Sequence, residues 1–376
     1  MATVLSPADE PGRTVLAVRI GENDNQPDRL PELLDMARSL PSTEAAIEAE
    51  AEVAAIRTAG LGKTVSEILT MGDDLRRAGL PLEVAGKAGG IRVFHLAGLT
   101  ALDPREHGFL AETFLDIPAV AQNALPTEEQ RRGWPVFGVR LSTGLDDFMA
   151  YLRRQGYSFR VRRVGVDTPC DKILAGRRHP YGDRITPTLF VAAGSDLPAA
   201  GALRHDELSA CLRDTQTFQL LAAGDTAGLG KLEDDDVRTT LRREKPKSIG
   251  HLARILATAS LPLECIDSGA VYEEDTMLEL QGLLGISLTD ARRLLGSRSR
   301  WDGTADQHRE WFVETARLSG MAPSEAEDRW QRLANEVRRI RSRSAMFEKA
   351  YRSLRAAYVR AHYPEEFGAM AAAQRG

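Results

Sequence analysis

The forty residues between Pro323 and Pro364 contain no glycine and no proline, the two residues that most often interrupt a helix. This stretch therefore predicts a long helix, or two helices in line. One stripe of mostly apolar residues recurs along it at spacings of three and four, as on one face of an α-helix: Trp330, Leu333, Val337, Ile340, Ser344, Phe347, Tyr351, Leu354 and Tyr358. The pattern from Leu203 onward is also helical, so the C-terminal half is predicted to be almost wholly α-helical.

A second line of residues on the same stretch is basic. Two interpretations of it stay open: a solvated face of a packed helix, or a stripe that faces phosphate groups. Its members are Arg338, Arg341, Lys349, Arg352 and Arg355.

The N-terminal half mixes strands and helices. A run of β-branched and apolar residues predicts a strand over 14–20, and Ser42 is a candidate cap for a helix over 43–57. A strand over 136–141 and a helix over 144–156 follow. The fold class is therefore α+β, with three parts predicted: an N-terminal segment (1–45), an α+β domain (46–200) and a helical domain (201–376).

Composition excludes several classes of protein. The formal net charge of −5 argues against a generally basic coat for nucleic acid, although local basic faces remain open. Cys170, Cys211 and Cys265 are widely spaced, which predicts neither a disulfide framework nor a zinc site and fits a reducing cytosol. No secretory signal pattern opens the chain, and no apolar run approaches the ~20 residues of a membrane span. A cytoplasmic protein without membrane contact is expected.

Four motifs in colinear order carry a resemblance to a known family. The most specific is Gly-Asp-Thr-Ala-Gly-Leu-Gly-Lys-Leu-Glu over 224–233, followed by Lys-Pro-Lys-Ser-Ile over 245–249. Together with the segments 98–115, 283–296 and 357–367, it resembles the palm and fingers of the bacterial DNA polymerase III α subunit, a C-family polymerase. The resemblance implies a polymerase-β-like nucleotidyltransferase palm in the domain 46–200 and a fingers-like helical domain after it.

The sequence departs from that family at the catalytic strand. The family's Pro-Asp-Ile-Asp-Ile-Asp falls on 135–140, where this chain has Pro-Val-Phe-Gly-Val-Arg. Two-metal phosphoryl transfer needs carboxylates that hold both ions, and Arg140 would repel cations there. No metal site is predicted, Mg²⁺ is expected only if other carboxylates substitute, and no other cofactor is implied.

Phosphate contacts are predicted at positions that match the family's motifs. The family's Gly-Arg-Gly-Ser loop corresponds to 84–90, which predicts either a phosphate-binding loop or a plain tight turn. In the fingers, a motif that faces the nucleotide becomes Ser-Arg-Ser-Ala-Met over 342–346 and keeps one positive charge. The candidate nucleotide- or phosphate-binding residues are Gly86, Lys87, Gly89, Lys231, Arg238, Arg242, Arg343 and Lys349.

These departures favour a pseudoenzyme that binds nucleic acid, a nucleotide or a protein partner without polymerising. One alternative is an enzyme repurposed for a nucleotide or small anionic substrate, with His179, Asp183 and Arg140 as candidate catalytic residues. Another is a docking subunit whose apolar stripe over 330–358 is partly exposed to a partner. Polymerase activity itself is not expected.

Overall fold

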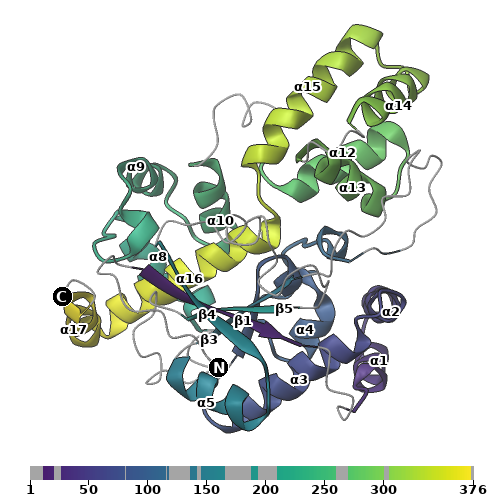
Figure 1. Cartoon of the computed structure of the whole chain (residues 1–376). Coiled ribbons are helices and arrows are strands. Elements are labelled where there is room, and N and C mark those ends of the chain that lie inside the picture. Colours follow the sequence, from purple (N-terminus) through teal and green to yellow (C-terminus); the bar gives the residue numbers. More distant parts are fainter. Residues whose placement is uncertain are drawn as a thin grey trace. The chain divides into compact units, whose positions relative to one another are not determined.

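The computed structural model describes residues 12–20, 27–80, 82–115, 117, 136–141, 145–165, 188–193, 210–259, 270–299 and 305–373 (Figure 1). These residues are mostly helical and include one small mixed β-sheet. The chain divides into two compact units. Unit 1 comprises residues 1–89, 93–101 and 131–208, and unit 2 comprises residues 90–92, 102–130 and 209–376.

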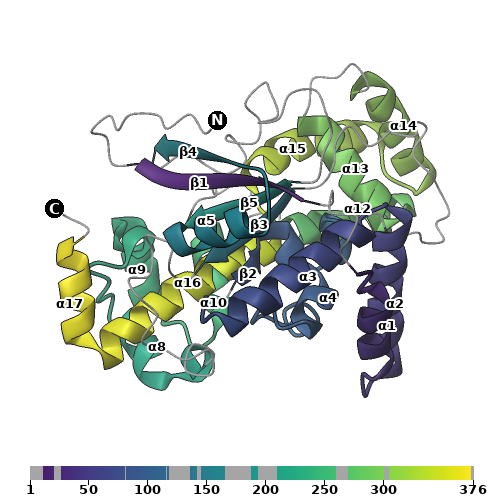
Figure 2. The same cartoon turned by 60° about the horizontal axis from the view of Figure 1, so that its bottom comes forward.

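Unit 1 contains the sheet (Figure 2). Its strands, in the order β2-β3-β5-β1-β4, are Leu82–Ala85, Val136–Leu141, Thr188–Ala193, Gly12–Arg19 and Phe159–Gly165. β3 and β5 run parallel, and the other three neighbouring pairs are antiparallel. The strands predicted over 14–20 and 136–141 are confirmed as β1 and β3.

Helices accompany the sheet in unit 1: α1 (Leu30–Arg38), α2 (Thr43–Thr58), α3 (Gly62–Arg77), α4 (Arg92–Leu96) and α5 (Leu145–Arg154). The predicted cap is confirmed, because the Ser42 side chain accepts a hydrogen bond from the Ala45 N–H at 3.3 Å. In the core, the rings of Phe94 and Phe137 meet edge to face with centroids 6.0 Å apart. Both rings are fully buried, so they anchor α4 and β3 to each other.

Unit 2 is helical in its described residues. Its first helices are α8 (Thr215–Ala222), α9 (Asp235–Glu244), α10 (Ile249–Thr258), α12 (Glu273–Leu284) and α13 (Leu288–Ser299). They are followed by α14 (Ala305–Leu318), α15 (Pro323–Arg339), α16 (Arg343–His362) and α17 (Pro364–Ala373). A buried cluster from α12 to α15 includes Phe312 and Trp330, whose ring centroids are 5.3 Å apart.

The stretch between Pro323 and Pro364 is two helices and not one. α15 ends at Arg339, and Ser342 caps the start of α16 by accepting a hydrogen bond from the Ala345 N–H. Between them, Arg341 pairs as an isolated β-bridge with Tyr272, and its carbonyl accepts a hydrogen bond from the Glu273 N–H at 3.1 Å. This extended pairing is incompatible with helical backbone at that point.

The apolar stripe on these helices is largely buried within the chain, and Tyr358 is half-buried, so among the described members the predicted partial exposure is limited to that end. Trp330, Leu333, Ile340, Phe347, Tyr351 and Leu354 are all at most 6% exposed. The interpretation of the basic residues on this stretch as a solvated face is wrong for Arg355, which is 3% exposed. Its guanidinium lies 5.4 Å from the centre of the Tyr351 ring. The side chain of Arg338 lies outside the described part. Among the described residues, no helix combines the length and apolar character that crossing a membrane requires.

Candidate functional site

Strand β3 occupies the place where the resemblance expects metal-binding carboxylates. Phe137, Val139 and Leu141 are 0%, 1% and 3% exposed and form its buried face. Successive residues of a strand alternate between its two faces, so positions 136, 138 and 140 share the other one. The resemblance implies aspartates at these three positions, among them the Asp-x-Asp pair that holds two metal ions, and this chain has valine, glycine and arginine there.

Gly138 is held close to the neighbouring strand. It pairs with Ala85 of β2, and a Cβ atom at position 138 would lie 3.2 Å from the Ala85 carbonyl oxygen. A side chain at this point would press against backbone, which cannot yield as the end of a flexible side chain can. The local geometry of β3 is therefore fitted to the absence of a side chain at 138.

Other carboxylates do not replace the missing ones in the described part of the chain. No group of three or more His, Cys, Asp or Glu side chains is placed there so that it could hold a metal ion. The residues present at β3 thus do not fit a two-metal centre. His179 and Asp183 lie outside the described residues, as does the side chain of Arg140.

The predicted phosphate loop forms a tight turn. β2 leads directly into a single 3-10 turn over Gly86–Gly90. Gly86 has φ +66°, a conformation that favours glycine, and a Cβ atom at Gly89 would lie 3.1 Å from the Val84 carbonyl oxygen. The turn therefore accounts for both glycines, while Lys87 is exposed and its binding to phosphate stays a prediction.

Arg343 lies in a ring of polar contacts in unit 2. Its Nη2 donates to Asp275 Oδ1 at 2.6 Å, and its Nη1 donates to the Gly108 carbonyl at 3.3 Å. The guanidinium also lies 5.0 Å from the centre of the Tyr272 ring. Because a carboxylate already compensates its charge, Arg343 holds the start of α16 against α12.

Two acidic residues complete this junction. Asp275 Oδ2 accepts from the backbone N–H groups of Val271 and Tyr272 at 3.0 and 2.8 Å, which caps α12. Glu274 is fully buried, and its Oε2 accepts from the Arg343 N–H at 2.7 Å. Burial raises the pKa of Glu274 to about 7 and that of Tyr272 to about 12. The junction therefore contains a carboxyl group that titrates near neutral pH.

The arginines of α9, which follow the 224–233 motif, also contact backbone carbonyls. Arg238 Nη2 donates to the Glu233 carbonyl at 2.6 Å, and Arg242 Nε donates to the Ala223 carbonyl at 3.2 Å. The Arg238 bond ties α9 to the 3-10 turn Gly230–Glu233 before it, and the Arg242 bond ties α9 to the C-terminal end of α8. Lys231 belongs to a 3-10 turn, but its side chain is outside the described part. Phosphate binding by these residues, and by the half-buried Lys349 of α16, stays a prediction.

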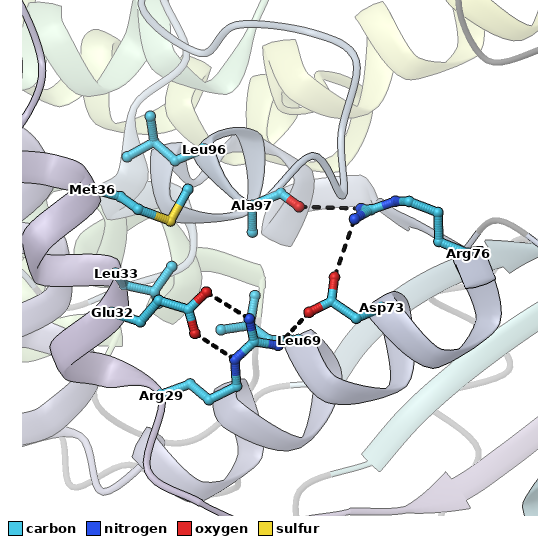
Figure 3. A pocket seen from close by; sticks show the side chains of 9 residues that line it. All are labelled: Arg29, Glu32, Leu33, Met36, Leu69, Asp73, Arg76, Leu96 and Ala97. Atoms are coloured by element: carbon cyan, nitrogen blue, oxygen red, sulfur yellow. Dashed lines mark hydrogen bonds and ion pairs between the residues drawn. The ribbon is translucent and has the colours of Figure 1, made fainter.

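Sequence reasoning missed a polar cavity in unit 1. It has a volume of about 210 Å³ and lies between α1, α3 and the end of α4 (Figure 3). Arg29 makes two 2.7 Å hydrogen bonds to Glu32 and a third to Asp73 Oδ2. Arg76 donates to Asp73 Oδ1 at 3.1 Å and to the Ala97 carbonyl at 3.2 Å. The only sequence signal for these ion pairs was the i,i+3 spacing of Arg29 and Glu32 and of Asp73 and Arg76.

The charges in this cavity compensate one another. The hydrogen bond from Arg29 lowers the pKa of Glu32, and the same contact raises the pKa of Arg29. Asp73 serves both arginines, so no charge on the cavity wall lacks an opposite charge. The arrangement stabilises α1 against α3 and provides no free cation for an anionic ligand.

Comparison with known proteins shows a distant and partial similarity. The chain is 28% identical over 204 residues to the DNA polymerase III subunit alpha of Thermus aquaticus, a match that covers 44% of this chain and 16% of that protein. It is 28% identical over 185 residues to the subunit alpha of Halalkalibacterium halodurans, covering 42% of this chain and 17% of that protein. No family model matches. The predicted resemblance to DNA polymerase III α subunits is confirmed, and the match spans about a sixth of those relatives.

Proposed function

We propose that this chain is a catalytically degenerate relative of DNA polymerase III α subunits, which binds nucleic acid in the cytoplasm without polymerising. The observation that carries the proposal is strand β3, where valine, glycine and arginine occupy the positions of the metal-binding carboxylates. In this proposal the sheet of unit 1 derives from the polymerase palm. The helices of unit 2 derive from the fingers.

Nucleic acid is a better ligand for such a scaffold than a single nucleotide. Ala85 stands where the family's phosphate loop has arginine, and Arg343 already pairs with Asp275. The contacts that would hold one triphosphate are therefore replaced or occupied. A nucleic-acid backbone spreads its charge over many phosphates and needs only a cationic surface to bind.

Primer extension tests the absence of polymerisation. The purified chain, supplied with a primed template, all four deoxynucleotides and either Mg²⁺ or Mn²⁺, is expected to extend no primer. A C-family polymerase serves as the positive control. The Asp183→Ala variant identifies contamination, since extension by a contaminating polymerase persists in it. Robust extension by the wild type that disappears in Asp183→Ala would overturn the proposal.

Binding is tested separately by fluorescence anisotropy with labelled single-stranded and duplex DNA. We expect saturable binding whose Kd rises with salt, so that log Kd increases linearly with the logarithm of the salt concentration. Binding that is absent at low salt contradicts the binding half of the proposal, whatever the result of the extension assay.

A further inference from the structure

We propose that the corner between α9 and α10, residues 242–254, is the surface that contacts the phosphate backbone of the nucleic acid, through Lys245, Lys247 and Arg254. This inference rests on the proposed function and locates its binding surface. The three residues are distinct from the arginines that hold the turn after α8.

The corner concentrates positive charge in an acidic chain. Between Arg242 and Arg254 there are five Lys or Arg residues and one acidic residue, whereas the chain as a whole has 49 basic and 54 acidic residues. Two of the few lysines in the chain, at 245 and 247, fall within it. A local excess of this kind attracts polyanions even when the net charge of the chain is negative.

The backbone fixes where these side chains lie. Lys245 ends α9 in the left-handed conformation, with φ +48°, and its N–H donates to the Leu241 carbonyl. Pro246 is buried directly after it, and Ser248 caps α10 by accepting from the His251 N–H at 3.2 Å. Both lysines are exposed on either side of the anchored proline. The corner therefore presents them from a defined turn.

His251 and Arg254 lie three residues apart on α10, so they are neighbours on one helix face. Lys247 lies just before the helix, next to the extended cap residue Ser248. The opposite face of α10 packs into unit 2 through Leu252, Ala253, Ile255 and Leu256. Arg254 is thus on the outward face of a helix that is anchored on its other side, and Lys247 lies at the entry to that helix.

The single acid of the corner is already engaged. Glu244 accepts from Arg243 at 2.9 Å and faces His251 Nε2 at 3.3 Å, and the bond from Arg243 lowers its pKa. Lys245, Lys247 and Arg254 make no ion pair with any carboxylate that the structure describes. Within the described ranges, no carboxylate competes with an external anion for these three charges.

The chemistry of the corner favours nucleic acid over a membrane surface. Basic segments that lie on membranes insert large apolar side chains beside their cations. Within the described ranges, the exposed large apolar residues are Ile47, Leu278 and Leu318, none of which belongs to α9 or α10. A purely cationic face suits phosphate contacts, which position a protein on nucleic acid without reading its sequence.

The test compares two charge-matched triple variants of the full chain. Lys245→Gln, Lys247→Gln and Arg254→Gln remove the three proposed charges and leave polar side chains in their place. The control, Arg57→Gln, Arg154→Gln and Arg332→Gln, removes the same charge from exposed arginines on α2, α5 and α15. Circular dichroism confirms that both variants fold.

The salt slope of DNA binding is the readout. Loss of three phosphate contacts is expected to reduce the slope of log Kd against log salt by about two to three and to weaken binding on the order of 10- to 100-fold at low salt. The control variant should keep the wild-type slope. If both variants lose affinity equally while the wild type binds, the corner is not the surface but the proposed function stands.

Two further outcomes contradict the inference in different ways. If the wild type does not bind DNA at any salt concentration, the proposed function fails first. If polyglutamate of equal charge displaces the DNA as well as unlabelled DNA does, the corner fits acidic proteins and its assignment to nucleic acid is overturned.

Discussion

Gly224 is the residue on which the 224–233 turn depends. Its φ of +67° lies in the left-handed region, and a Cβ atom there would be 2.4 Å from Arg242 Nε. Gly224→Ala is therefore expected to destabilise unit 2 by about 2 kcal/mol, from backbone strain and from displacement of Arg242. Urea unfolding followed by tryptophan fluorescence measures the change.

Gly282 of α12 provides the matched control. A Cβ atom there meets nothing within 4 Å, and its φ is not in the left-handed region. Gly282→Ala should leave stability unchanged or raise it by about 0.5–1 kcal/mol, as expected for a helix interior. If both variants behave alike, the turn does not depend on Gly224 as argued.

Glu274 predicts a pH dependence of stability. Its pKa is about 7 in the folded chain against 4.5 as the ordinary value, so the folded chain binds the proton more tightly. Its contribution is full below about pH 4.5 and is lost as pH rises to 7, by at most roughly 1.4 kcal/mol per pH unit. In the Glu274→Gln variant, the thermal midpoint of unfolding should depend less on pH over this range than in the wild type. The exposed Glu310→Gln variant should keep the wild-type pH dependence. An unchanged slope in Glu274→Gln would assign the titration to another group.

At the scale of elements, the sequence predicted those strands and helices that are determined by residues within or next to the element itself. β3 follows from its alternating buried residues, and α2 follows from Ser42 and the residues after it. The sequence left open whether 324–363 forms one helix or two, and it did not predict the break at 340–342, because that break depends on the pairing of Arg341 with Tyr272, about seventy residues earlier in the chain. Arg242 and Arg343 show the same limit, because the sequence could not predict their contacts to the Ala223 carbonyl and to Asp275, which depend on tertiary packing. Phosphate binding by either residue stays a prediction.

The ion pair between α12 and α15 is the element-scale contact most open to test. Arg329 Nε and Nη2 each donate to a Glu279 carboxylate oxygen at 2.6 Å, and the Arg329 side chain is 7% exposed. Glu279→Ala removes the carboxylate that accepts both of these bonds from the buried guanidinium and is expected to cost about 2–3 kcal/mol. Glu314→Ala, which breaks an exposed pair with Arg317, should leave the unfolding midpoint unchanged. Equal midpoints for the two variants would contradict this role.

At the scale of the whole molecule, each unit is assembled from separated segments of chain. In unit 2, Thr289 Oγ1 donates to the Ile117 carbonyl at 2.9 Å, and Phe109 lies 5.3 Å from Phe347 between ring centroids. Leu110 packs against the core of α12 to α15. The segment 102–117 is therefore part of the packing of unit 2, although some ninety residues separate it from the rest.

This assembly predicts a result for a truncated chain. A fragment of residues 209–376 should unfold at a lower temperature than unit 2 does in the full chain, because the surface that 102–117 covers is exposed. A saturating peptide of residues 102–117 should raise the thermal midpoint by several degrees through linkage, and a scrambled peptide should not. A fragment as stable as the full chain would show that this segment contributes nothing to unit 2.

Gly138 bears on whether a metal site could be built on β3. A two-metal centre needs more than one carboxylate, so a single substitution at 136, 138 or 140 would leave an incomplete site with no activity to select. The change at 138 also places a Cβ atom 3.2 Å from the Ala85 carbonyl, so β2 must shift to accommodate it. A route by single substitutions thus includes a step that displaces the β2 backbone by a few tenths of an ångström and gains no function. Natural selection would retain this sheet as a scaffold more readily than it would build a metal centre on it.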